Sequence, residues 1–239
     1  MKYNKIDKQL FIENRQRFMA QMKPNCIAIF HANDQMMRNG DCYFPFRQNS
    51  DLFYLTGLDQ EDVILVLYPN CPKGKAFEQI IFTKQTNEHI AVWDGYKYTK
   101  EDASETSGIE TIHWLSAMKN VLNEMILLSD GIYVNSNEND RADVAYPTKD
   151  QRHTKILSDE YPGHPLHRSQ PIMKKLRMIK SQFEIDIMQK ACDITRSAFL
   201  SVLKHTKPEM FEYEVEAHVI YEFIPVSYTH LTLPTTPYV

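Results

Sequence analysis

Apolar positions along this chain change from helical spacing to continuous runs and back, and this alternation predicts its elements. Residues 4–22 carry apolar side chains near one helical face, with charged residues opposite. Val63–Tyr68 is an almost uninterrupted apolar run, which predicts a strand buried on both faces. The other predicted elements are strands at Cys26–Phe30, Leu52–Thr56 and Gln79–Thr83, a helix over Ala117–Leu128 with Ser116 as N-cap, and a last short strand at Ile132–Val134. Strands alternating with helices predict an α/β layer architecture.

A polar region follows these elements. From Asn135 to about Arg168 the chain contains few apolar runs and several proline residues. We interpret it as irregular structure ending in a linker, with a helix expected over Asp150–Leu157. The domain boundary is expected between Pro165 and Pro171, because proline residues interrupt regular secondary structure there.

Two long helices are predicted beyond the linker. Ser181 and Glu184 have capping-box spacing, in which each side chain satisfies a free backbone N–H group. Apolar residues then recur every three or four positions as far as Val202, and a second helix is expected over residues 211–224. Two helices cannot bury such wide apolar faces alone, so these faces need a further partner.

The last fifteen residues, Pro225–Val239, break the preceding pattern. The acidic helix stops in mid-period, and no Asp, Glu, Lys or Arg follows. The Val226–Thr236 stretch resembles the translation of a transposase-adapter sequence used in DNA library preparation. We therefore expect the reading frame to run from a genuine gene into adapter DNA near residue 225. The alternative is a native β-rich tail, and genomic DNA encoding it would exclude the adapter.

Composition narrows the function classes. The 239 residues are 43% hydrophobic and 24% charged, which are globular values. The formal net charge is -4 and no basic block is present, so a nucleic-acid partner is not expected. No apolar run approaches a membrane span, and the N-terminus has no apolar signal-peptide region. We expect no membrane partner.

The cysteine pattern indicates a reducing compartment. Cys26, Cys42, Cys71 and Cys192 form no Cys-x-x-Cys pair. Reduced, partly buried thiols in a cytoplasmic protein are therefore expected, and a disulfide framework is not.

Most combinations of chemically active residues have a simpler structural interpretation. His164 and His167 lie among prolines, with no further ligands nearby, and are expected to be exposed linker residues. The carboxylates of Glu212, Glu214 and Glu216 have a period of two on a predicted helix, which scatters them over a solvated face. No nucleophile elbow surrounds Ser50, and no phosphate-binding glycine loop is present.

The run Phe44–Gly57 is the most informative stretch. Its first half is polar and charged and its second half is aromatic, so it reads as a loop that enters a strand and stops at Gly57. The polar cluster could face a ligand or partner at a strand edge, or could form a surface turn.

This run closely resembles the Arg-Gln-Asn-Ser-Asp-x-x-Tyr-x-Thr-Gly segment of aminopeptidase P, the Xaa-Pro aminopeptidases of the creatinase/prolidase ("pita-bread") family. Weaker similarities follow in the family's order and together cover residues 4–224. They are Asn14–Phe18, Glu61–Leu67, Trp93–Lys97, Arg177–Lys180 with Glu184 and Ile185, and Pro208–Met210 with Glu212 and Glu214. The family usually has Gly in place of Glu209.

The resemblance implies an N-terminal creatinase-like domain, a mixed sheet flanked by helices, over residues 1–168. It implies the start of a truncated pita-bread catalytic domain, two helices, over 169–224, with 225–239 as the adapter segment. The full-length parent would be a cytoplasmic metallo-aminopeptidase that forms a homo-oligomer and acts on proline-containing peptides. Its pair of Mn²⁺ or similar divalent ions would be bound by two Asp, two Glu and one His in the missing part. We therefore assign no catalytic residue and no metal ligand here, and expect the fragment to be inactive.

Arg47 and Asp51 are the remaining candidates. In the resembled family this loop approaches an active-site mouth, so the carboxylate could limit substrate length or receive a substrate N-terminus, with the guanidinium paired to it. A purely structural pair between Arg47 and Asp51 is the alternative. For the whole chain, the alternatives are a prolidase or creatinase-like relative and a non-enzymatic assembly or binding module.

Overall fold

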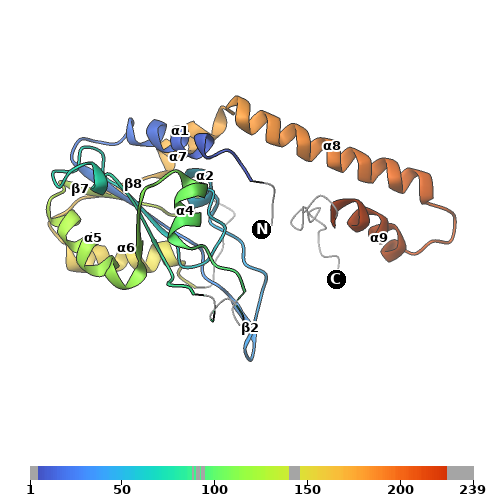
Figure 1. Ribbon diagram of the computed structural model, residues 1–239, viewed down its shortest axis with the longest axis horizontal. Coiled ribbons are helices and arrows are strands. Elements are labelled where there is room, and N and C mark those ends of the chain that lie inside the picture. The colour runs from blue at the N-terminus through green and yellow to red at the C-terminus, as the bar shows by residue number, and fades with distance from the viewer. Residues whose placement is uncertain (1–4, 88, 90–91, 93–94, 140–145, 225–239) are drawn as a thin grey trace. The chain divides into compact units, whose positions relative to one another are not determined.

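The computed structural model describes residues 5–87, 89, 92, 95–139 and 146–224. Its contacts divide the described residues into two compact units, Ile6–Ile179 and a second that contains residues 180–224. The division falls after Ile179, later than the boundary expected between Pro165 and Pro171. Figure 1 shows the helices and strands of both units, which we describe separately. The adapter segment predicted at 225–239 lies outside the described residues.

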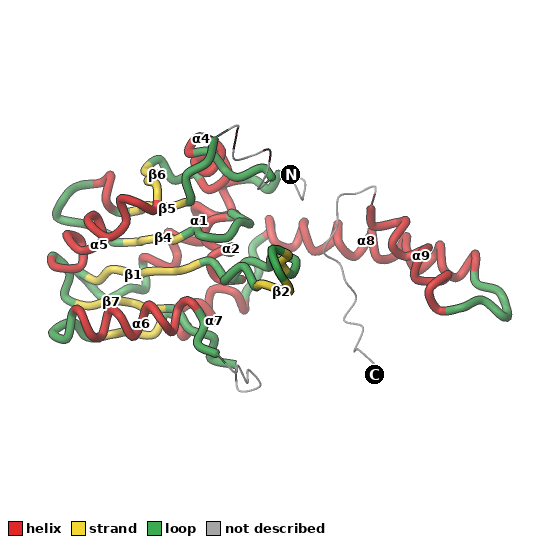
Figure 2. Tube along the Cα trace, turned by 90° about the horizontal axis from the view of Figure 1, so that it is seen from below, coloured by secondary structure: helices red, strands yellow, loops and turns green. Residues whose placement is uncertain are grey.

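The first unit is built on a six-stranded mixed sheet (Figure 2), ordered β6-β5-β4-β1-β7-β8. The central strand β1 pairs antiparallel with β4 and parallel with β7. Beyond them, β4 pairs antiparallel with β5, while β5–β6 and β7–β8 are parallel. The strands are β1 Cys26–His31, β4 Ile64–Leu67, β5 Gln79–Thr83, β6 Thr111–Trp114, β7 Gly131–Val134 and β8 Leu166–Arg168.

Helices cover both faces of the sheet, which confirms the predicted α/β class with a mixed sheet flanked by helices (Figures 1 and 2). One face packs on α1 Lys8–Met19, α2 Ser50–Thr56, α4 Lys100–Ser107 and α7 Gln170–Met178. The other packs on α5 Met118–Leu127 and α6 Lys149–Glu160. Along β4, Leu65 and Leu67 belong to the first core, and Ile64 and Val66 to the second. The strand predicted at Val63–Tyr68 is therefore buried on both faces, as expected.

Three local predictions are wrong. Leu52–Thr56 forms part of helix α2, not a strand, because the Asn49 side chain accepts hydrogen bonds from the backbone N–H groups of Asp51 and Leu52. Ser116 lies in the 3₁₀ turn Leu115–Ala117, so it is not the N-cap of α5. Ile132–Val134 is not the last strand, since β8 follows it.

A small hairpin lies outside the main sheet. Strands β2 Met37–Asn39 and β3 Cys42–Tyr43 are antiparallel, and the turn between them contains Gly40 with φ +56°. This agrees with the turn signal at Asn39-Gly40-Asp41. A further 3₁₀ turn spans Lys75–Phe77. All four cysteines are free thiols: Cys26 and Cys71 are buried, and Cys42 and Cys192 are exposed.

The second unit contains two helices, α8 Gln182–His205 and α9 Glu212–Phe223. The predicted capping box is present, with Ser181 accepting from the Glu184 N–H and Glu184 accepting from the Ser181 N–H. Between the helices, Glu209 adopts φ +70°, a left-handed conformation that favours glycine. No described helix is both long and apolar enough to cross a bilayer.

Apolar side chains of this second unit remain exposed. Ala198 and Phe223 are its buried residues within α8 and α9. Large exposed side chains include Met188, Phe199, Leu200, Leu203, Phe211, Tyr213, Ile220 and Tyr221. The expectation that two helices leave wide apolar faces uncovered is confirmed for the described residues.

Candidate functional site

A polar cleft of about 320 Å³ lies in the first unit, where the carboxyl ends of two parallel strands meet. β1 ends at His31 and its parallel neighbour β7 ends at Val134, so the residues that follow both strands leave the sheet at one edge. The first residues of α2, α6 and α7 also line this cleft. Such an edge is where ligands of α/β proteins usually bind.

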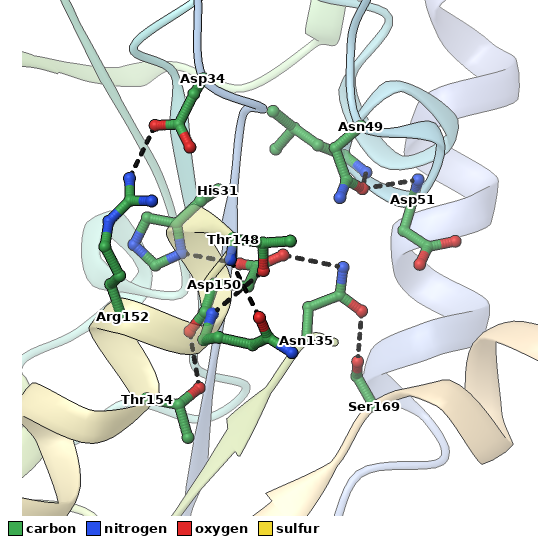
Figure 3. A network of polar contacts seen from close by, with 12 residues as sticks. His31, Asp34, Asn49, Asp51, Asn135, Thr148, Asp150, Arg152, Thr154 and Ser169 are labelled. Carbon is green, nitrogen blue, oxygen red and sulfur yellow. Dashed lines mark hydrogen bonds and ion pairs between the residues drawn. The ribbon is translucent and has the colours of Figure 1, made fainter. Parts of the chain in front are cut away.

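His31 and Asp150 form the first part of a buried polar network in Figure 3. The His31 Nδ1 atom lies 3.0 Å from Asp150 Oδ1, and the two residues are 4% and 8% exposed. The second oxygen, Asp150 Oδ2, accepts from Asn135 Nδ2 at 3.5 Å. Asp150 belongs to the first turn of α6, where the helix dipole favours a negative charge.

Asn135 continues the network towards α7. Its Oδ1 atom accepts hydrogen bonds from Ser169 Oγ at 2.8 Å and from Gln170 Nε2 at 3.1 Å. Gln170 Nε2 also donates to Asp51 Oδ2 at 2.6 Å, and Arg177 Nη1 donates to Asp51 Oδ1 at 2.7 Å. The chain of polar contacts therefore runs without a break from His31 on β1 to Arg177 at the end of α7.

A second imidazole adjoins the network. His153, on α6, lies edge-on to His31 with ring centroids 4.4 Å apart. Burial, and then the neighbouring His31 imidazole, lower the pKa of His153 from 6.5 to about 3. The neutral form of His153 therefore predominates at neutral pH, and the ring acts as a packing group beside the pair formed by His31 and Asp150.

Arg47 lines a different recess from Asp51. This aromatic pocket of about 260 Å³ adjoins the polar cleft, and the two share Asn33, Thr148 and Lys149. The Arg47 backbone oxygen accepts from Asn33 Nδ2 at 3.0 Å. The apolar lining of the aromatic pocket consists of Met36, Phe44, Pro45, Phe46 and Tyr146. The substrate-access role suggested for Arg47 and Asp51 stays a prediction.

Sequence reasoning missed the partners of Asp51. Gln170 and Arg177 lie 119 and 126 positions from it along the chain, so no local pattern connects them. A weak signal existed for His31 and Asn135, because each is a polar residue at the end of, or directly after, a buried strand. The family block containing Asp51 was recognised, but its long-range contacts were not.

The other candidate residues behave mostly as structural groups. His164 packs against Tyr161, and His167, within β8, packs against Tyr133. Both are partly buried, so the expectation of exposed linker histidines is wrong. Glu212, Glu214 and Glu216 are exposed, as expected for a solvated face. Within the described parts of the chain, no three His, Cys, Asp or Glu side chains converge to hold a metal ion.

Known proteins resemble this chain in its N-terminal domain and beyond it. The family model for the aminopeptidase P N-terminal domain matches residues 11–133. The Xaa-Pro aminopeptidase of Haemophilus influenzae is 28% identical over 219 residues, which cover 92% of this chain and 48% of that protein. The chain thus spans about half the length of the curated relatives it matches.

Solved structures match a similar share of the chain. A Bacillus anthracis protein assigned as an aminopeptidase P superposes with a TM-score of 0.83 at 24% identity, over 92% of this chain and 52% of that one. Zinc-substituted Escherichia coli aminopeptidase P in complex with product superposes with a TM-score of 0.75 at 25% identity, over 93% of this chain and 50% of that one. Both similarities extend well beyond the residues matched by the family model.

Proposed function

Because this chain belongs to the aminopeptidase P family through its N-terminal domain, we propose that it is the N-terminal part of a Xaa-Pro aminopeptidase. The whole enzyme would release the first residue of peptides that have proline second. The observation that carries this proposal is the alignment with Xaa-Pro aminopeptidase over 92% of this chain but only 48% of the relative. A chain of this extent would contain the N-terminal domain and the beginning of the catalytic domain.

Two parts of the chain would divide the work of that enzyme. We propose residues 1–168 as the N-terminal domain and 169–224 as the start of the catalytic domain, a division that assigns α7, although it packs in the first unit, to the second part. The first unit has its own two-sided core around the sheet, as an independent domain needs. The exposed apolar side chains of α8 and α9 support a further segment that covers them in the whole enzyme.

The residues described here do not fit a catalytic metal site. No three metal-binding side chains converge among them, whereas a catalytic metal needs about three protein ligands. We therefore propose that the divalent ion pair, Mn²⁺ or similar, binds in the half of the enzyme beyond this chain. When bound, such ions supply an activated water and a polarised carbonyl. The zinc-substituted Escherichia coli protein supports the choice of a divalent metal.

The first unit would restrict substrate access to the active site and support assembly of the oligomer. Arg47 lies beside a pocket with aromatic walls, which suits contact with a peptide near the mouth of an active site. We propose a homo-oligomer in the cytoplasm, the compartment being chosen because the four cysteines are free. The prolidase and creatinase-like alternatives would act on a different substrate.

One observation favours a non-enzymatic module as the second candidate. The first unit contains the complete sheet and both helical layers, so it could fold and bind a partner without a catalytic domain. The exposed apolar faces of α8 and α9 argue against this candidate, since a stand-alone module would leave them in water.

The test is to recover the downstream coding sequence and to compare the longer protein with the 239-residue chain. Both would be incubated with Mn²⁺ and Xaa-Pro peptides, with matched peptides lacking proline at position two as the substrate control. We expect release of the first residue by the longer protein only, abolished by a chelator. Activity of the short chain, or a longer protein that ignores proline, would contradict the proposal. A downstream sequence without the Asp, Asp, His, Glu, Glu order would favour the module.

A further inference from the structure

We propose that Asp51 is a positioning residue that holds helix α7 and, through α7, the point where the chain enters the second unit. The inference deepens the proposed function and depends on it in one respect, because it concerns the connection to the helices assigned to the catalytic domain. The contacts that carry it lie entirely within the first unit and do not depend on any enzymatic activity.

One carboxylate contacts both ends of α7. Asp51 Oδ2 accepts from Gln170, the first residue of this nine-residue helix, and Oδ1 accepts from Arg177, next to its last residue. Residues seven positions apart lie two turns apart on the same helix face, about 10 Å along the axis, so the long side chains of Gln170 and Arg177 converge on the Asp51 carboxylate between them. Asp51 itself is held in the first turn of α2, where the helix dipole favours its charge.

Burial strengthens this contact. The Asp51 side chain is 8% exposed, while that of Arg177 is 45% exposed. A charge removed from water needs an opposite charge and hydrogen bonds to compensate for lost hydration. Arg177 and Gln170 supply these to Asp51, and α7 must keep its place and orientation for both to do so.

The carboxyl end of α7 is held as well. The Leu176 carbonyl accepts from Arg17 Nη2 at 3.1 Å and from Tyr54 Oη at 3.4 Å, so α1 and α2 both contact it. Only Ile179 and Lys180 then separate α7 from Ser181, the N-cap of α8. Fixing α7 therefore fixes the position from which the second unit begins along the chain.

The same contacts weigh against a direct role for Asp51 with substrate. A carboxylate that receives a substrate N-terminus must have an accessible oxygen. Both Asp51 oxygens already accept hydrogen bonds from α7, and little of the side chain reaches solvent. The positioning role uses these contacts as they stand, whereas a substrate amino group would have to share these oxygens with Gln170 and Arg177.

Amide hydrogen exchange on the 239-residue chain tests the proposal. In the Asp51→Ala variant we expect exchange in residues 170–178 to rise about tenfold, the effect of losing hydrogen bonds to a charged group. Exchange in β1, β4 and β5 should not change. Asp34→Ala is the matched control, because Asp34 also binds an arginine at 2.7 Å but on α6, and it should leave α7 protected.

A second set of variants separates positioning from general stabilisation and serves if Asp51→Ala does not fold. Arg177 is half exposed, so Arg177→Ala should fold, and it should reproduce the faster exchange in α7. The Asp51→Ala, Arg177→Ala double variant should exchange little faster than either single variant. Arg177→Lys should retain most of the protection, because it keeps the positive charge.

Unchanged exchange in α7, an equal increase throughout the first unit, or additive effects in the double variant would overturn the proposal. So would a failure of Arg177→Lys to restore protection. None of these measurements requires peptidase activity, so their failure is distinguishable from an inactive longer protein.

Discussion

Replacing Gly57 by alanine should destabilise the first unit much more than the same change at Gly40. Gly57 ends helix α2 with φ +71°, and a Cβ atom there would lie 2.3 Å and 2.5 Å from two ring atoms of Phe11. Gly40 has a similar φ of +56°, but its Cβ would meet nothing within 4 Å. The two variants therefore share the backbone strain and differ in the clash.

The change in the free energy of unfolding combines three terms. Left-handed backbone costs a non-glycine residue about 1–2 kcal/mol. Overpacking a close-packed core costs about 1–3 kcal/mol more, and Phe11 is only 2% exposed, so its ring has little room to move. Alanine recovers about 0.4–1 kcal/mol by restricting the unfolded chain. We expect a loss of about 2–4 kcal/mol for Gly57→Ala and about 1 kcal/mol or less for Gly40→Ala.

Thermal unfolding followed by tryptophan fluorescence would measure this difference, because Trp114 is the last residue of β6 in the first unit. A loss of about 2–4 kcal/mol should lower the midpoint by roughly 5–15 °C. Adding Phe11→Ala should make the Gly57→Ala change much less costly, since the ring that it meets is gone. Equal shifts for the two glycine variants, or strict additivity with Phe11→Ala, would refute the predicted clash.

Two further predictions concern pH and the second unit. Because the pKa of His153 is lowered from 6.5 to about 3, the unfolded chain binds a proton that the folded chain does not. Stability should therefore fall as pH drops below 6.5, and in denaturant titrations His153→Gln should show a shallower fall between pH 6.5 and pH 4 than the parent. Because φ is +70° at residue 209, Glu209→Gly should raise the free energy of unfolding of α8 and α9 by up to about 1 kcal/mol, seen as a higher thermal midpoint in circular dichroism. Lys207→Gly, the control, should not raise it.

Local patterns were sufficient for several elements and for the family. The buried strand at Val63–Tyr68 followed from its continuous apolar run, and the start of α8 followed from the capping box of Ser181 and Glu184. The Arg-Gln-Asn-Ser-Asp block at residues 47–51 identified the family that the comparisons then showed. These features succeed because their physical causes act between residues close in sequence or along a single element.

The tertiary structure decided the form of the segment after Asn49. Its aromatic and β-branched residues favour a strand, but the Asn49 cap and the close fit of Gly57 against Phe11 make it the helix α2. Intrinsic strand propensity is weak compared with a side-chain cap and core packing, so the local prediction failed there. Asp51 consequently lies in the first turn of a helix and points towards α7.

The candidate site was also a product of the fold. The sequence by itself determined that polar residues follow β1 and β7, and that a charged block precedes Gly57. Only the parallel pairing of those strands brought His31 and Asn135 to one edge, and only the placement of α7 gave Asp51 its partner Arg177, 126 positions away. Contacts between residues so distant depend on how whole elements pack, because burial of the apolar faces sets the position of every polar group carried with them.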